Sequence, residues 1–284
     1  MMRKVKNNII AITKDVLGNI LVTLRPQKVK ELSKKGLTLE LGDNLSLSER
    51  LMRRAFLKKV GKAEDYDKLS QLHKTYWTKQ GDDFVNHTQN KLANTNLPAY
   101  KSILEVLNKQ VTDGSIKFNK LVEIGTGNGS VLNYLSSEFL SIDHFVGIDL
   151  SSEQTIINKE TYNNNSKLDF VAGDVLEWIE HQEKGDMVFL TFRGVLEYFT
   201  QRQLADFFKK LNDLGNIIFF AIEPTDSNHN YEEHPGSKVY GFEASFSHNH
   251  KKLFEEAGFN IWHTGQKEEP WHPHIMRIIG AKNF

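Results

Sequence analysis

The sequence predicts an α/β fold, a doubly wound and mostly parallel sheet of seven strands with an antiparallel C-terminal hairpin. Three observations carry this prediction. A glycine-rich turn joins a short apolar strand to a helix within residues 120–135, KLVEIGTGNGSVLNYL. Further along, β-rich apolar runs alternate with helical patterns, as crossovers between parallel strands require. The last two apolar runs are joined by a polar segment with two prolines, which favours an antiparallel pair.

The glycine-rich turn places Gly125, Gly127 and Gly129 at alternate positions before a helix that starts near Ser130. Glycine suits such a turn because a Cβ would block its backbone conformations and the close approach of a ligand. The helix start presents unpaired N–H groups and a positive dipole end to that ligand. The dinucleotide fingerprint G-x-G-x-x-G requires its third glycine at position 130, so the match to NAD-type sites is imperfect.

Composition indicates an ordinary globular chain of 284 residues, with 39% hydrophobic and 25% charged residues. The chain has no cysteine, which excludes disulfides, thiolate zinc sites and cysteine nucleophiles, and fits a reducing compartment. No apolar run approaches the roughly 20 residues needed to cross a bilayer, and no secretory signal begins the sequence. We therefore expect a soluble, cytoplasmic protein.

Charge is unevenly distributed, although the formal net charge is zero. Residues 1–62 contain 15 Lys or Arg against 5 Asp or Glu, a surplus of ten. A basic segment of this kind could contact an anionic membrane surface, a nucleic acid or an acidic partner. The favoured interpretation is a solvated basic face, and the neutral total argues against nucleic acid.

Residues 1–97 form an N-terminal extension to the predicted sheet domain, residues 98–284. Residues 8–25 alternate apolar and polar side chains around DVLGN, which favours a β-hairpin. An amphipathic helix interrupted at Gly18 is the alternative. Such a helix, if basic, would suggest contact with a membrane. Ser46 and Glu49 form a capping box that opens a helix to about Val60. A second helical pattern covers residues 63–94. Segments in this position often cover an active site, so substrate-contact candidates there are Tyr66, Tyr76, Trp77 and His87, with a core role the simpler interpretation.

The sheet domain begins with a helix at Pro98 and continues with strands expected at 120–124, 144–149, 168–174, 185–191 and 215–224. Helices are expected at 152–163, 175–182 and 201–211. The segments FNIWHTGQ and PHIMRIIGA complete the sheet as the antiparallel pair. In open α/β sheets, ligands bind outside the carboxyl ends of the strands, which directs attention to Asp149 and Asp174. Asp149 ends the second strand, where a carboxylate can accept hydrogen bonds from both hydroxyls of a ribose.

With Glu123, the turn becomes E-x-G-x-G-x-G, and together with Asp149 and Asp174 it resembles the class I S-adenosylmethionine (SAM) dependent methyltransferases over residues 98–284. The resemblance implies that SAM is bound and converted to S-adenosylhomocysteine. It further implies that the acid at 174 meets the adenine amino group and that Glu123 helps to hold the ammonium of SAM. The implied cofactor site comprises Glu123, Gly125, Thr126, Gly127, Gly129, Asp149, Leu150, Gly173, Asp174, Val175, Thr191, Phe192 and Arg193.

The methyl acceptor is expected to be a small polar metabolite of the sugar or natural-product type, methylated at oxygen or nitrogen. The stretch 245–259, SFSHNHKKLFEEAGF, stands where such enzymes place a substrate-facing loop and helix. His248 and then His250 are the first candidates for a base, because histidine titrates near neutrality; packing or capping roles explain them equally well. Glu223 is a further candidate for the base and is preferred to Glu197, because it lies on the ligand edge of the sheet. Glu197 and Tyr198 are candidates for substrate contact, and Glu197 could equally be a structural helix residue.

A metal site is not expected, because no cluster of hard oxygen ligands accompanies the two acids, and His272 and His274 in WHPH lack supporting carboxylates. An RNA or protein methyltransferase that uses the basic extension is an alternative. Methylation of a base or glutamine amino group is disfavoured, because FRGV follows the fourth strand instead of an Asn-Pro-Pro-Tyr-like motif. A SAM-binding module without catalysis is the alternative from a different class.

Overall fold

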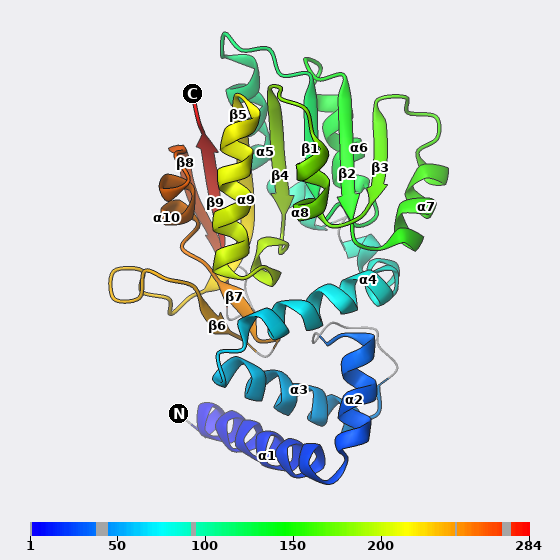
Figure 1. The fold of residues 1–284 in the computed structure, drawn as a ribbon, viewed down its shortest axis with the longest axis vertical. Helices are drawn as coiled ribbons and strands as arrows, with labels where there is room; N and C mark the ends of the chain where they lie inside the picture. Colours follow the sequence, from blue (N-terminus) through cyan, green and yellow to red (C-terminus); the bar gives the residue numbers. More distant parts are fainter. Residues whose placement is uncertain (1, 38–44, 92–94, 242, 269–273) are drawn as a thin grey trace.

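The computed structural model of the chain describes residues 2–37, 45–91, 95–241, 243–268 and 274–284 (Figure 1). In chain order its elements are α1 (Met2–Leu24), α2 (Pro26–Lys35), α3 (Leu47–Lys62), α4 (Tyr66–Lys91), α5 (Leu97–Thr112), β1 (Lys120–Ile124), α6 (Ser130–Glu138), β2 (His144–Asp149), α7 (Ser152–Thr161), β3 (Leu168–Ala172), α8 (Val175–Trp178), η2 (Ile179–His181), β4 (Met187–Phe192), η3 (Leu196–Tyr198), α9 (Gln201–Leu214), β5 (Ile217–Asp226), β6 (Lys238–Tyr240), β7 (Ser245–Ser247), α10 (His250–Glu256), β8 (Asn260–Glu268) and β9 (His274–Lys282).

The main sheet has the strand order β3-β2-β1-β4-β5-β9-β8. From β3 to β5 all neighbours are parallel, whereas β9 is antiparallel to both β5 and β8. The predicted mostly parallel, seven-stranded sheet with an antiparallel C-terminal pair is therefore confirmed. The chain moves outward from β1 to β3 on one side and from β4 to β5 on the other. The switch point, where open sheets bind ligands, lies between β1 and β4.

Apolar layers cover both faces of this sheet. One layer packs α5 and α6 against the strands, and the other packs α9 and α10 against the opposite face (Figure 1). All six residues of β4 are buried, as expected for a central strand with helices on both sides. The carboxyl ends of the parallel strands point toward α4, which lies across them. Any ligand at the switch point would therefore lie between the sheet and α4.

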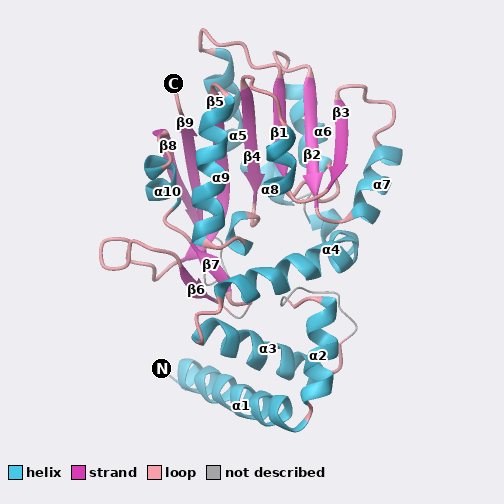
Figure 2. Ribbon diagram, in the orientation of Figure 1, coloured by secondary structure: helices cyan, strands magenta, loops and turns pink. Residues whose placement is uncertain are grey.

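The N-terminal helices form their own apolar cluster at this end of the sheet. The cluster includes Met52 and Leu57 of α3, Leu69 of α4 and Phe246 of β7. β7 pairs with β6 in a separate two-stranded sheet, which the sequence did not predict. Figure 2 shows these helices gathered beyond the carboxyl ends of the strands. The capping box of Ser46 and Glu49 is present at the start of α3, as predicted.

The β-hairpin predicted for residues 8–25 is wrong, because residues 8–24 belong to the single helix α1. Gly18 is a helix-contact residue instead of a turn residue. A Cβ added at Gly18 would lie 2.5 Å from the carbonyl oxygen of Leu51 and 2.8 Å from the Cβ of Ala55. The glycine therefore lets α1 cross closely over α3. No helix in the described part of the chain is both long and apolar enough to span a membrane.

Candidate functional site

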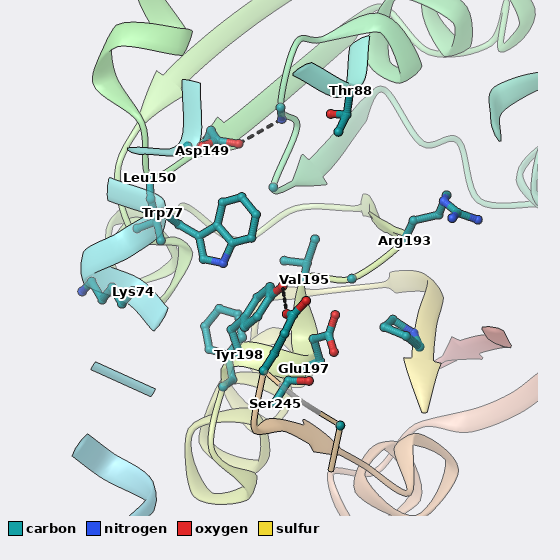
Figure 3. Close-up of a pocket in the computed structure, with 18 of the residues that line it drawn as sticks. Lys74, Trp77, Thr88, Asp149, Leu150, Arg193, Val195, Glu197, Tyr198 and Ser245 are labelled. Atoms are coloured by element: carbon teal, nitrogen blue, oxygen red, sulfur yellow. Dashed lines mark hydrogen bonds between the residues drawn. The ribbon is translucent and has the colours of Figure 1, made fainter. Parts of the chain in front are cut away.

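A cavity of about 1130 Å³ lies at the switch point. Its walls come from the glycine turn, the carboxyl ends of β2 and β3, the loop after β4, and β6 and β7 (Figure 3). Helices α1, α3 and α4 close the opposite side. This volume is slightly above the usual range for ligand pockets, so it can hold a nucleoside-sized molecule and a second small ligand.

The glycine turn adopts the left-handed backbone that its sequence predicts, with φ of 70° at Gly125, 51° at Gly127 and 71° at Gly129. Gly125 and Gly127 line the cavity. An added Cβ at Gly127 would meet nothing closer than 3.7 Å, so the positive φ alone demands glycine there. Gly129 does not line the cavity, and an added Cβ would lie 2.8 Å from the Phe170 ring. Its small size serves the packing of the turn.

Asp149 holds the glycine turn from the end of β2. Its Oδ2 accepts a hydrogen bond from the N–H of Gly127 at 2.9 Å, and its Oδ1 accepts one from the N–H of Ser151 at 3.0 Å. Burial raises the pKa of Asp149, and these backbone donors oppose that shift. Each carboxylate oxygen can accept a further hydrogen bond. Asp149 and Leu150 therefore offer the cavity a positioned acceptor beside an apolar surface.

Glu123 lies behind the turn and reaches the cavity wall from β1. Only 2% of the residue is exposed, and it accepts a hydrogen bond from the Thr126 hydroxyl at 2.7 Å. Burial, and to a smaller extent the Asp149 carboxylate, raise the pKa of Glu123 to about 8. A cation brought next to Glu123 would favour its ionised form, because opposite charges stabilise one another in a buried site.

Asp174 joins the sheet to α4. Its Oδ1 accepts a hydrogen bond from the N–H of Leu176 at 2.8 Å and so caps α8, while its Oδ2 forms an ion pair of 2.6 Å with Lys74. Asp174, Gly173 and Val175 all line the cavity. Lys74 could not be predicted from local sequence, because its partner lies 100 residues further along the chain.

The loop after β4 turns sharply at Arg193, with φ of 67°, and at Gly194, with φ of 105°. Arg193 donates a hydrogen bond to the Tyr100 hydroxyl at 3.0 Å and points away from Trp77 and Glu197 in Figure 3. Of the three residues predicted here, Phe192 and Arg193 line the cavity, whereas Thr191 is fully buried and does not.

Glu223 does not line the cavity, and its side chain instead holds the loop after β4. Its Oε2 accepts hydrogen bonds from the N–H groups of Val195 at 3.0 Å and Leu196 at 3.1 Å. Burial raises the pKa of Glu223 to about 7. The structure therefore does not bring this candidate base to a ligand.

Glu197 is the acid that the structure does bring to the cavity on the side opposite the glycine turn. Its Oε2 accepts a hydrogen bond from the Tyr240 hydroxyl at 2.9 Å. Gly194 allows this placement, because a Cβ there would lie 2.8 Å from Oε1 of Glu197. Burial, and next the neighbouring Glu243 carboxyl, raise the pKa of Glu197 to about 8. Glu197 can therefore exchange a proton close to neutral pH.

Aromatic rings stand beside this acid. Tyr198 and Trp77 both line the cavity, with ring centroids 5.4 Å apart, and Figure 3 shows Tyr198 next to Glu197. The Tyr198 hydroxyl donates a hydrogen bond to Glu243 at 3.3 Å. Tyr240 and Glu243 were not predicted, and Ser245 lies in the predicted substrate-facing stretch 245–259 without having been singled out; the stretch 238–247 supplies all three. Its short, irregular pattern carried no motif that would have singled them out.

His248 and His250 do not line the cavity, contrary to expectation. His248 is fully buried, and both ring nitrogens are occupied: Nδ1 lies 2.6 Å from the Ser237 hydroxyl and Nε2 lies 3.1 Å from the Leu196 carbonyl oxygen. Burial lowers the pKa of His248 to about 3. His250 is 3% exposed at the start of α10, and burial holds its pKa well below the usual value. This geometry favours a packing role for both histidines.

The structure places the two other tyrosines that were predicted to contact the substrate away from the cavity. Tyr76 is 2% exposed and belongs to the core, and Tyr66 packs edge-on against Phe246 at 5.6 Å. Neither lines the cavity. The side chain of His87 and the whole of His272 lie outside the described residues. Among the residues that are described, no three His, Asp or Glu side chains gather as metal ligands would.

Comparison with known proteins agrees with the fold. Residues 121–214 match the model of a family described as a methyltransferase domain. The fold resembles magnesium protoporphyrin IX methyltransferase from Synechocystis PCC 6803 with bound SAM, with a TM-score of 0.51 and 15% identity over 76% of this chain and 97% of that one. A SAM-dependent methyltransferase from Leishmania major gives a TM-score of 0.51 and 13% identity over 76% of this chain and 82% of that one.

The N-methyltransferase NodS from Bradyrhizobium japonicum, in complex with S-adenosylhomocysteine, is similar with a TM-score of 0.49 and 12% identity over 77% of this chain and 97% of that one. The search of curated proteins found no matching sequence. The matched family model identifies a methyltransferase domain over residues 121–214, and the sheet with its antiparallel end gives the chain a fold that resembles the Synechocystis methyltransferase.

Proposed function

We propose that this enzyme transfers the methyl group of SAM to an oxygen or nitrogen atom of a small polar metabolite. One observation carries the proposal: a single cavity joins the glycine turn and Asp149 on one side to Glu197 and Tyr198 on the other. The residues proposed to bind the cofactor and the residue proposed to exchange a proton therefore line the same cavity. Residues 98–284 would form the catalytic domain, and residues 1–97 would cap it.

The cofactor would be held by the glycine-turn side of the cavity. Asp149 would accept hydrogen bonds from the ribose hydroxyls, and Glu123 would face the ammonium group. Asp174 and the N–H of Val175 would meet the adenine, with Leu150 beside it. Gly127 lines the cavity and has no side chain, which supports a close approach of the ligand to the main chain. SAM carries its methyl group on a sulfonium, from which S-adenosylhomocysteine is already a good leaving group.

The protein would contribute mainly alignment and the exclusion of water. Trp77 and Tyr198 would orient the acceptor beside the loop that follows β4. Glu197, in its ionised form, would take the proton that a hydroxyl or amine loses as it is methylated. Its hydrogen bond from Tyr240 would hold the carboxylate in place. We place the base at Glu197 because His248, His250 and Glu223 do not line the cavity.

An acceptor screen tests this proposal. Sugars, amines and hydroxylated aromatic metabolites would be incubated with the protein and SAM, and S-adenosylhomocysteine would be measured. The proposal expects turnover with at least one of these acceptors and a strong loss in Glu197→Gln, with SAM affinity unchanged. A protein that binds SAM yet never forms S-adenosylhomocysteine would support a non-catalytic binding module instead. We further propose that the protein works in the cytoplasm, with which a chain without cysteine is compatible.

A further inference from the structure

The outward side of α1 is an exposed apolar surface, which we call the α1 face. Its members are 43–72% exposed: Ile10, Ile12, Val16, Leu17, Ile20 and Leu24. A helix turns by about 100° per residue, so positions four or seven apart share one side. Residues 12, 16, 20 and 24 are four apart, and residues 10, 17 and 24 are seven apart. The six side chains therefore cover about half of the helix surface, with Ile10 at the edge that borders the cavity.

The packing of α1 fixes the α1 face outward. The opposite side of the helix meets α3 at Gly18, where there is no room for a Cβ. Asp15 forms ion pairs with Arg54, at 2.8 Å, and with Lys58 on the same helix α3. α1 cannot rotate to bury the α1 face without breaking both contacts. In Figure 1, α1 lies at the end of the molecule farthest from the sheet.

Positively charged residues near the α1 face favour an anionic partner. Lys14 is exposed one turn from Ile10, and Arg25 follows the end of the helix. Residues 1–62 carry a surplus of ten basic residues. Two copies that met through this face would bring two such surpluses together, which electrostatic repulsion opposes. An anionic lipid surface would instead satisfy both the cations and the α1 face.

We propose that α1 docks the protein on an anionic lipid surface, with its apolar face in the headgroup region and its neighbouring cations on the headgroups. Ile10 and Lys14 also line the cavity. Docking would therefore place one wall of the cavity beside the lipid surface. The inference stands apart from methyl transfer, because it rests on the exposed side of α1 and the cations near it and on none of the proposed cofactor or base residues.

Vesicle flotation tests this proposal with the full chain. The vesicles are pure phosphatidylcholine, or phosphatidylcholine mixed with an equal part of phosphatidylglycerol. The expected result is binding to the anionic vesicles, weaker binding to the neutral ones, and release as salt is raised. The double variant Val16→Gln/Ile20→Gln should bind the anionic vesicles at least roughly tenfold more weakly than the unchanged protein. The reason is that it removes two apolar side chains from the centre of the α1 face.

The matched control is Ile156→Gln/Ile157→Gln on α7, where both side chains are also exposed, at 60% and 40%. It should bind vesicles as the unchanged protein does. Circular dichroism and SAM titration confirm that each variant is folded, and they report on the methyltransferase site separately. Absence of binding to any vesicle, or equal binding by the α1 variant, would overturn the proposal. A lipid-independent dimer that this variant dissociates would identify a second copy as the partner and overturn it too.

Discussion

Asp149→Ala tests the cofactor site most sharply. In the structure the Asp149 carboxylate already accepts hydrogen bonds from the N–H groups of Gly127 and Ser151, so its position is fixed before any ligand binds. Charge-assisted hydrogen bonds to ribose hydroxyls contribute about 1.5–3 kcal/mol. Their loss should raise the Kd for SAM by roughly 10- to 150-fold. The Kd would be measured by isothermal titration calorimetry.

The substitution also leaves the two backbone N–H groups without their acceptor. We therefore expect the free energy of unfolding to fall by about 1–3 kcal/mol, measured by urea denaturation. Asp143→Ala is the matched control, since Asp143 is an exposed acid just before the opposite end of the same strand β2. It should change neither quantity. An Asp149→Ala protein that is folded and binds SAM with unchanged affinity would refute the ribose assignment.

Further predictions concern the base, the buried histidine and the first helix. Once an acceptor is known, kcat/KM should rise with pH through about 8, because Glu197 must lose its proton to act as a base; Glu197→Gln should remove this rise, and a rise that persists would exclude Glu197. His248→Ala should lower the free energy of unfolding by about 1–3 kcal/mol, since it leaves Ser237 and Leu196 without a buried partner, and the pH profile of turnover should keep its shape. A changed pH profile of turnover would indicate that His248 takes part in the reaction. Gly18→Ala should cost about 1–3 kcal/mol in urea denaturation, because its Cβ meets backbone of α3, and an unchanged midpoint would show that α1 and α3 separate easily.

The sheet could be predicted from the sequence because its signal is local. Each strand is a short apolar run beside a helical pattern, and parallel neighbours need crossover helices. The C-terminal pair was likewise evident from its polar connection. The same local logic failed at residues 8–25, where Gly18 was interpreted as a turn. Only its contact with α3 explains the glycine, and that partner lies more than 30 residues away.

The residues of the cavity show the same limit of prediction from local sequence. Glu123 and Gly127 belong to one local motif and Asp149 ends the next strand, and the structure places all three at the cavity. His248 has suitable chemistry, but its ring points into the protein and both nitrogens are occupied. The direction of a side chain depends on tertiary packing, which spacing does not reveal. The hydrogen bond between Glu197 and Tyr240 joins residues 43 positions apart, so no motif contains it.

Calorimetric titration with SAM and S-adenosylhomocysteine, with NAD as the control, tests the central claim most directly. The cavity and the position of Asp149 predict micromolar binding of SAM and S-adenosylhomocysteine and no binding of NAD. Binding of NAD alone would contradict the assignment of the glycine turn to a methyltransferase, and the role given to Glu197 would fall with it.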